Sequence, residues 1–285
     1  MEETGAGDVQ LLDEQLLEAT RLSESGDEHA AMQLLLSLEP EHPEDATLLC
    51  MLGALSAHLG SDGMAADFFR RTLAQNPTNP QILVTAGSGL AGSADPAAEA
   101  ALRLAALTAP ELPAARMHYG AYLVRNGLTD QGIEELHAAR ALDPDDAEIR
   151  SHLGTAYLQA KRPAEALQEL EAASADQDPD AKLLYGLVLI QEGDLAEAAE
   201  ELHPVGEALA DEPEVQVLLA LLFAAQEWEE EAWLAVSRAE AGSSPIDPAV
   251  IREVEEALAS GPEAARILLI EEVAPAALRD RLHAL

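Results

Sequence analysis

The sequence has little that would build a sheet or a disulfide framework. Aromatic residues make up 3% of its 285 residues, β-branched residues are scarce, and Ala, Leu and Glu dominate. This composition favours helices over strands. The single cysteine, Cys50, excludes an intrachain disulfide and a cysteine-rich metal site.

Positive charge is also scarce. The chain has 16 Lys and Arg against 53 Asp and Glu, for a net charge of −37. Such a surface repels nucleic-acid phosphates and anionic membranes, which argues against both as partners. Two explanations of the acidity stay open, a solvated surface such as salt adaptation produces and recognition of a basic partner.

Long apolar runs are missing as well. The longest, Val217–Ala225, has nine residues, and a membrane span needs about 20. The first eight residues, MEETGAGD, are acidic and contain no basic segment ahead of an apolar run, so we expect no signal peptide. The sequence therefore predicts a soluble, cytoplasmic protein.

Catalytic signatures are absent too. The chain contains no HExxH, GxxxxGK[ST], GxSxG or CxxC pattern. Paired carboxylates such as Glu134-Glu135 carry little information in a chain with 53 acidic residues. We therefore predict no enzymatic activity, no cofactor and no metal site.

What the sequence does contain is a repeat. Residues 146–179 hold Leu153-Gly154, Tyr157, Ala166, Leu170 and a closing Pro179. Small residues at the Gly154 position recur at spacings of 32 to 34 residues along the chain. They are Ala19, Gly53, Gly87, Gly120, Gly154, Gly186 and Ala220. This pattern predicts helix–turn–helix units in which the small residues allow two helices to cross closely.

The pattern resembles the tetratricopeptide repeat (TPR) family, whose 34-residue repeat reads W-x2-L-G-x2-Y, A-x3-F, P. The resemblance covers about Val9 to Pro245; the family's tryptophan is missing, with Arg150 in its place in the best-preserved repeat. It implies an all-α, right-handed α-solenoid (TPR superhelix) of about seven repeats.

The expected organisation has three parts. Residues 1–8 are expected to be a disordered tail, residues 9–245 the repeat array, and residues 246–285 capping helices. We expect the third repeat to be degenerate, because Gly87 and Gly89 weaken its first helix, and we interpret it as a soft joint. The cap should consist of an atypical helix pair and a last short helix over 276–285.

The resemblance also implies a concave groove lined by the first helix of each repeat. Transferred to this register, the partner-binding residues are Cys50, Met51, Ala54, His58, Gln81, Val84, Ser88, Met117, His118, Ala121, Arg125, Ser151, His152, Thr155, Gln159, Leu183, Leu187 and Gln191. At its C-terminal end the groove is apolar, and the protein's own last helix is an alternative occupant there. His118 and His152, which lie 34 residues apart, should stack along one face as a polar lining, and a metal site would need a third ligand.

The expected function is a non-enzymatic adaptor or chaperone-like scaffold that binds a peptide or amphipathic helix of a partner protein, possibly a basic one. Two alternatives stay open, a self-associating scaffold and a docking subunit of a partner enzyme. A carboxylate clamp of the co-chaperone type is not expected. The corresponding positions hold Cys50, Ala54, Val84 and Ser88, with Arg125 as the one obvious cation.

Overall fold

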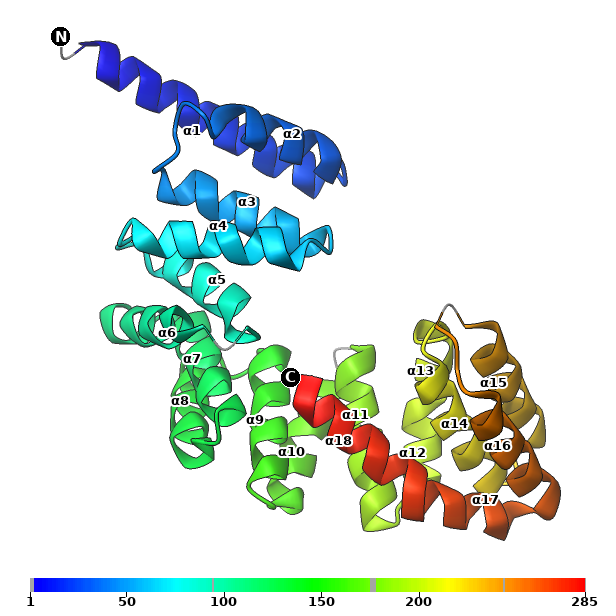
Figure 1. Ribbon diagram of the computed structural model, residues 1–285. Coiled ribbons are helices and arrows are strands. Elements are labelled where there is room, and N and C mark those ends of the chain that lie inside the picture. Colours follow the sequence, from blue (N-terminus) through cyan, green and yellow to red (C-terminus); the bar gives the residue numbers. More distant parts are fainter. Residues whose placement is uncertain (1–2, 94, 175–177, 243, 285) are drawn as a thin grey trace. The chain divides into compact units, whose positions relative to one another are not determined.

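The structure, a computed structural model, describes residues 3–93, 95–174, 178–242 and 244–284, and every regular element in these ranges is a helix (Figure 1). The chain divides into two compact units. The N-terminal unit comprises residues 1–123 and 134–143, and the C-terminal unit comprises residues 124–133 and 144–285. The all-α fold predicted from the repeat is confirmed.

Helix pairs build the N-terminal unit. Its helices are α1 (Glu3–Glu24), α2 (Glu28–Leu38), α3 (Ala46–His58), α4 (Asp62–Ala74), α5 (Pro80–Ala91) and α6 (Pro96–Thr108), and it shares α7 (Pro113–Arg125) and α8 (Thr129–Leu142) with the other unit. α1 begins at Glu3, so a helix covers most of the segment where we expected a disordered tail. Residues 1–2 lie outside the described part.

The C-terminal unit begins with α9 and continues in pairs. Its helices are α9 (Ala147–Gln159), α10 (Pro163–Ser174), α11 (Pro179–Glu192), α12 (Leu195–Leu202), α13 (Val205–Ala208), α14 (Pro213–Ala225), α15 (Glu229–Ala241), α16 (Pro248–Ser260), α17 (Pro262–Leu268), the π-helical η1 (Leu269–Val273) and α18 (Ala274–Ala284). Pro204 separates α12 from α13, because proline cannot donate the backbone bond that a continuous helix needs.

Short acidic side chains start many of these helices. Asp27 accepts a hydrogen bond from the amide of Ala30, which confirms the N-cap predicted for this residue. Asp146 does the same for the amide of Ile149 at the start of α9. Each such cap satisfies an amide that has no partner within the helix and contributes about 1 kcal/mol.

The recurring small residues allow close helix crossings, as the repeat pattern predicts. A Cβ atom on Gly154 of α9 would lie 2.4 Å from Cγ of Leu170 on α10. One on Gly186 of α11 would lie 2.4 Å from Cγ of Leu202 on α12. Because real side chains do not approach so closely, only glycine fits while the large apolar residue keeps its place. The two signature positions therefore form one packing unit.

The third repeat differs from its interpretation as a soft joint. α5 is a regular helix, and both of its interior glycines pack against neighbouring side chains. A Cβ on Gly87 would lie 2.8 Å from Cγ of Leu102, and a Cβ on Gly89 would lie 2.1 Å from Cε2 of Phe69. Both glycines therefore allow close packing of α5 against its neighbours. Their low helix propensity, on which the prediction of a soft joint rested, does not by itself describe this repeat.

At the C-terminal end, α17, η1 and α18 follow one another without a break from Pro262 to Ala284. Where the sequence predicted a pair and a separate short helix, the chain turns gradually through the π-helical segment. α18 packs against α11 and α14 (Figure 1). Its Ala274 and Leu278 are buried in the same apolar cluster as Leu183 and Leu187 of α11. Leu285 lies outside the described residues.

Candidate partner-binding surface

The helices of the first two repeats border a pocket of about 430 Å³. We call it the His58 pocket. It is lined by Ala19, Thr20, Ser23, Glu28, Leu35, Met51, Ala54, Leu55 and His58. Three predicted site residues, Met51, Ala54 and His58, meet here.

Helical spacing explains how these side chains come together. Met51, Ala54 and His58 stand at i, i+3 and i+7 on α3, so they share one face of that helix. Ala19 and Ser23 stand one turn apart on α1. Both helices thus turn one face toward the same space.

The pocket has an apolar floor and a charged end. Ala19 and Leu35 are almost completely buried and form its floor, whereas Ala54 and His58 are exposed. The Nε2 atom of His58 lies 2.7 Å from Oε1 of Glu28. Because His58 is well exposed, this contact adds little stability and mainly holds the two groups at the pocket's end.

The polar groups of the pocket offer contacts to a bound side chain. A hydrolytic serine would need a hydrogen bond to its histidine. Among the described side chains of the pocket, the Ser23 hydroxyl makes no hydrogen bond to His58, whose Nε2 faces Glu28. The apolar floor can take up an apolar side chain of a ligand, and the Glu28 carboxylate can accept a hydrogen bond from an N–H or O–H group of the same ligand. No group of residues able to hold a metal ion is found in the described part of the chain.

The remaining predicted site residues are exposed, half-buried or buried. Gln81, Arg125 and Gln191 are exposed, and a half-buried group comprises Ser88, His118, Ala121, Ser151, His152 and Gln159. These residues belong to two different units. A continuous groove and the stacking of His118 with His152 therefore stay predictions. His152 lies one helical turn after Glu148 on α9, and its Nε2 is 3.9 Å from Oε1 of Glu148.

For a further set of residues the prediction of an open lining is wrong, because the structure buries their side chains. They are Cys50, Val84, Met117, Thr155, Leu183 and Leu187. Cys50 packs in a cluster with Phe69, Ala86 and Leu90. Cys50, Val84, Met117 and Leu183 each stand three residues before the small signature residue of their repeat, and at this position the side chain is buried in the core.

The sequence comparisons agree with this architecture. Two family models, both described as tetratricopeptide repeat, match residues 120–180 and 157–222. The middle of the chain, residues 120–222, belongs to the tetratricopeptide-repeat family. The models reach only the middle of the chain, and the other repeats are assigned by the helix pairs and glycine contacts described above. Among curated protein sequences, none matches the chain significantly.

Solved structures of TPR proteins are similar to this chain. A TPR protein from Parabacteroides merdae is 16% identical over 90% of this chain and 99% of its own, with a TM-score of 0.61. A thermophilic TPR protein from Thermus thermophilus is 26% identical over 62% of this chain and 98% of its own, with a TM-score of 0.51. The first similarity supports the fold alone.

In this TPR protein the C-terminal helix α18 packs against α11 and α14 of the later repeats. Leu183 and Leu187 of α11 lie in one cluster with Leu278 of α18. Arg281 of α18 forms ion pairs with Asp180 and Glu212 at the start of α11 and beside α14. This arrangement supports the alternative in which the protein's own last helix fills the apolar end of the groove.

Within the described ranges, no helix is long and apolar enough to cross a membrane.

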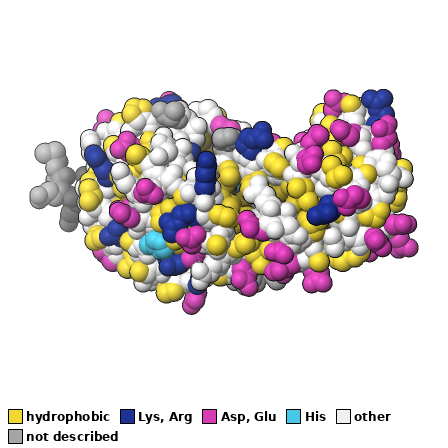
Figure 2. Space-filling model, turned by 90° about the horizontal axis from the view of Figure 1, so that it is seen from below, with side chains coloured by type: hydrophobic (Ala, Val, Ile, Leu, Met, Phe, Trp, Pro, Cys, Tyr) yellow, Lys and Arg dark blue, Asp and Glu magenta, His cyan; other side chains and the backbone are white. Residues whose placement is uncertain are grey.

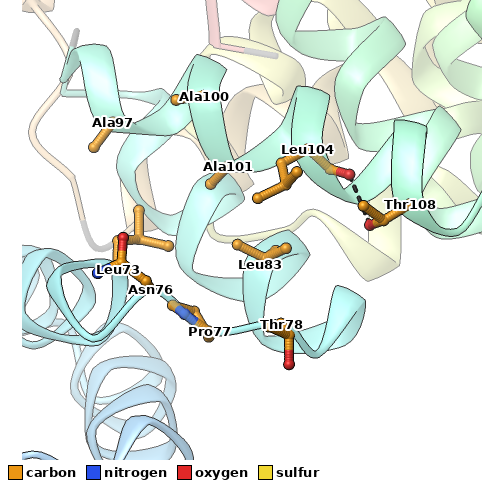
Figure 3. A pocket seen from close by; sticks show the side chains of 10 residues that line it. All are labelled: Leu73, Asn76, Pro77, Thr78, Leu83, Ala97, Ala100, Ala101, Leu104 and Thr108. Carbon is orange, nitrogen blue, oxygen red and sulfur yellow. Dashed lines mark hydrogen bonds between the residues drawn. The ribbon is translucent and has the colours of Figure 1, made fainter.

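A second apolar pocket, of about 360 Å³, lies on α5 and α6 and was not predicted (Figure 3). Leu73, Leu83, Ala101 and Leu104 line it, and Leu104 and the nearby Leu107 are 45% and 72% exposed. The available signal was the composition of α6, which has only Glu99 and Arg103 as charged residues. An outer helix so poor in charge is unusual for a solvated face.

The buried Cys50 gives a testable property of the TPR core. Burial raises the pKa of its thiol to about 11, and a hydrogen bond from Thr85 offsets part of this effect. At pH 8 about 0.1% of such a thiol is ionised, against about a quarter of an unperturbed cysteine. We expect the native protein to react with Ellman's reagent at least about 100-fold more slowly than the unfolded protein. Equal rates would contradict the burial of Cys50.

Proposed function

We propose that this TPR protein is a non-enzymatic adaptor, or chaperone-like scaffold, that binds a peptide or helix of a partner protein at the inner side of its first two repeats. The TPR fold supports a protein–protein interaction scaffold in general terms. The observation that carries the finer proposal is the His58 pocket, in which an apolar floor ends at the contact between Glu28 and His58. In this proposal the protein acts in the cytoplasm.

The pocket suits one anchoring side chain better than a long buried segment. A volume of about 430 Å³ accommodates one or two large side chains. Met51 adds an unbranched, adaptable wall that tolerates partners of different shape. An apolar residue of an amphipathic helix, followed by a polar residue that reaches Glu28, matches this arrangement.

The later repeats are less suitable for the same role. Leu183 and Leu187 are 2% and 0% exposed, with α18 packed against their helix. A partner would have to displace α18 before reaching them. The proposal therefore places the first contact in the N-terminal unit.

Site-specific photocrosslinking tests this placement. A benzoylphenylalanine at Ala54, which is exposed in the pocket, is expected to crosslink one discrete partner from lysate of the source cells. The control places the same residue at Gln33, which is exposed on α2 and does not line the pocket. We expect crosslinks at position 54 only.

A substitution gives a second readout of the same proposal. Ala54→Glu adds a carboxylate beside Glu28 without entering the core, so we expect the crosslinked partner to be captured at least about tenfold less while helicity is unchanged. The matched control is Gln33→Glu. Equal capture by both variants, or equal crosslinking at positions 33 and 54, would exclude the pocket as the binding site.

A further inference from the structure

Acidic side chains are spread over the surface of this protein (Figure 2), but in the C-terminal unit they meet aromatic rings. The α14–α15 turn borders an open hollow of about 740 Å³, which we call the Trp228 hollow. Glu200, His203, Glu227, Trp228 and Glu229 to Glu231 line it. The chain has nine aromatic residues in 285, so rings at a surface hollow are unusual here.

Three rings form the aromatic part of the hollow. Trp228 stacks on Phe223, with ring centroids 5.6 Å apart and planes inclined by 21°. The imidazole of His203 meets the edge of Trp228, with centroids 6.0 Å apart. Trp228 is half-buried, so part of its surface stays open to a ligand. The faces of such rings carry negative potential and attract cations.

The carboxylates have a partly structural explanation. Glu229 to Glu231 form the first turn of α15, where acidic side chains are favourable to the helix dipole. Glu200 of α12 and Glu227 of the turn lie outside that first turn and line the same hollow. The carboxylates alone would therefore not define a ligand site.

An independent observation comes from Gln216. This residue is completely buried, and its Nε2 donates to the carbonyl oxygens of Gly206 and Leu209, at 3.0 Å each. Its Oε1 is buried and has no hydrogen-bond partner. Leaving such an acceptor unsatisfied is unfavourable, so the site calls for a donor.

The Gln216 side chain lines a cavity of about 130 Å³ that adjoins the Trp228 hollow, because His203 and Glu231 line both. Arg238 also lines this cavity, but its Nη1 donates to the carbonyl oxygen of Gly206, at 2.9 Å. The two hollows together carry six carboxylates against this one guanidinium. A donor that enters from the Trp228 hollow would therefore meet a negative potential.

Rings, carboxylates and an unpartnered acceptor select the same chemistry, a cation that only donates hydrogen bonds. We propose that the Trp228 hollow binds the guanidinium of an arginine side chain from a partner polypeptide. A planar guanidinium stacks on Trp228 while its N–H groups donate to the carboxylates of the hollow, whereas an ammonium offers no plane for stacking. Gln216 Oε1 is closed to solvent in this structure, so the guanidinium reaches it only when the side chains that separate the two cavities move aside. This site is independent of the His58 pocket and rests on the proposed function only in that its ligand is a polypeptide.

Tryptophan fluorescence tests the proposal without an identified partner. Trp233→Phe leaves Trp228 as the single tryptophan. The probe is an acetylated, amidated Gly-Arg-Gly peptide at low ionic strength, and its control is the same peptide with citrulline, which keeps the shape and lacks the charge. We expect saturable quenching by the arginine peptide and at least about tenfold weaker binding of the citrulline peptide. Equal binding of the two, or no saturation, overturns the proposal.

Matched charge variants separate a site from general attraction to an acidic protein. Glu227→Gln with Glu230→Gln removes two carboxylates from the hollow and should weaken arginine binding about tenfold. Glu253→Gln with Glu256→Gln removes two exposed carboxylates of α16 and should change it less than about twofold. An equal loss in both variants overturns the site. The side-chain amide resonance of Gln216 should also shift on binding, and an unchanged resonance contradicts the role of Gln216.

Discussion

Gly89→Ala is expected to lower the free energy of unfolding by about 1–3 kcal/mol, although alanine favours helices over glycine by about 1 kcal/mol. The added Cβ would lie 2.1 Å from Cε2 of Phe69 and 2.5 Å from its Cδ2. The ring is 2% exposed and cannot move away, because its other side lies against Gly53, where a Cβ would be 2.6 Å from the ring. Overpacking therefore outweighs helix propensity.

Urea unfolding followed by circular dichroism measures this loss, with Gly63→Ala as the control. Gly63 also belongs to a helix, as the second residue of α4, but a Cβ there would meet nothing within 4 Å. We expect Gly63→Ala to be neutral or to stabilise by up to about 1 kcal/mol. Phe69→Leu should recover part of the loss in the Gly89→Ala background, because it removes the ring. A stabilising Gly89→Ala would show that the ring does not lie between the two glycines.

Leu278→Asp is expected to detach α18 and to lower the stability of the C-terminal unit by about 3 kcal/mol. Leu278 is 6% exposed and belongs to the apolar cluster of Leu183 and Leu187. A carboxylate there must either be buried without a partner or leave with its helix. The Arg281 ion pairs cannot hold the helix alone, because Asp180 and Glu212 are 61% and 42% exposed and such pairs contribute at most about 1 kcal/mol.

Limited proteolysis and the urea midpoint of tryptophan fluorescence measure this effect, since both tryptophans lie in the C-terminal unit. The variant should be cleaved within α18 much faster than the parent protein. Arg279→Asp places the same side chain on the neighbouring, exposed position and should leave both readouts nearly unchanged. If Leu278→Asp behaves like Arg279→Asp, α18 does not cover α11 in solution.

The repeat could be predicted from the sequence because its signals are local or periodic. The spacing of Gly154 and Leu170 implies a close helix crossing, and the structure has that crossing. Asp27 follows Gly26 and precedes a helical pattern, which predicts an N-cap. In the structure its side chain does accept a hydrogen bond from the backbone amide of Ala30. In both places, the relevant partner lies within 16 residues.

The candidate site was predicted less well because burial depends on neighbours from other repeats. Met51, Ala54 and His58 do line a pocket, but Cys50, one position away on the same helix, is core. Successive residues of a helix point about 100° apart, so Cys50 faces the core while Met51 faces the pocket. The alignment with the family repeat is too coarse to distinguish these two directions. Gly89 posed a similar problem, since its meaning depends on a ring 20 residues earlier.

Distant packing explains the remaining differences. From the sequence, Leu183 and Leu187 are predicted to line an apolar groove. In the structure α18, about 90 residues later in the chain, packs against their helix. The Trp228 hollow needed the side chains of α12, α14 and α15 together. Gln216 gave no sequence signal, because only coordinates show that its Oε1 lacks a partner.

The most direct test of the account is hydrogen–deuterium exchange of the protein with the partner recovered through position 54. We predict slower exchange in α3, over residues 46–58, and in the part of α1 that lines the His58 pocket, with α11 and α18 unchanged. The opposite result, in which α11 becomes protected while α18 exchanges faster, would show that the partner displaces α18 and binds the later repeats. That result would contradict the placement of the partner at the His58 pocket.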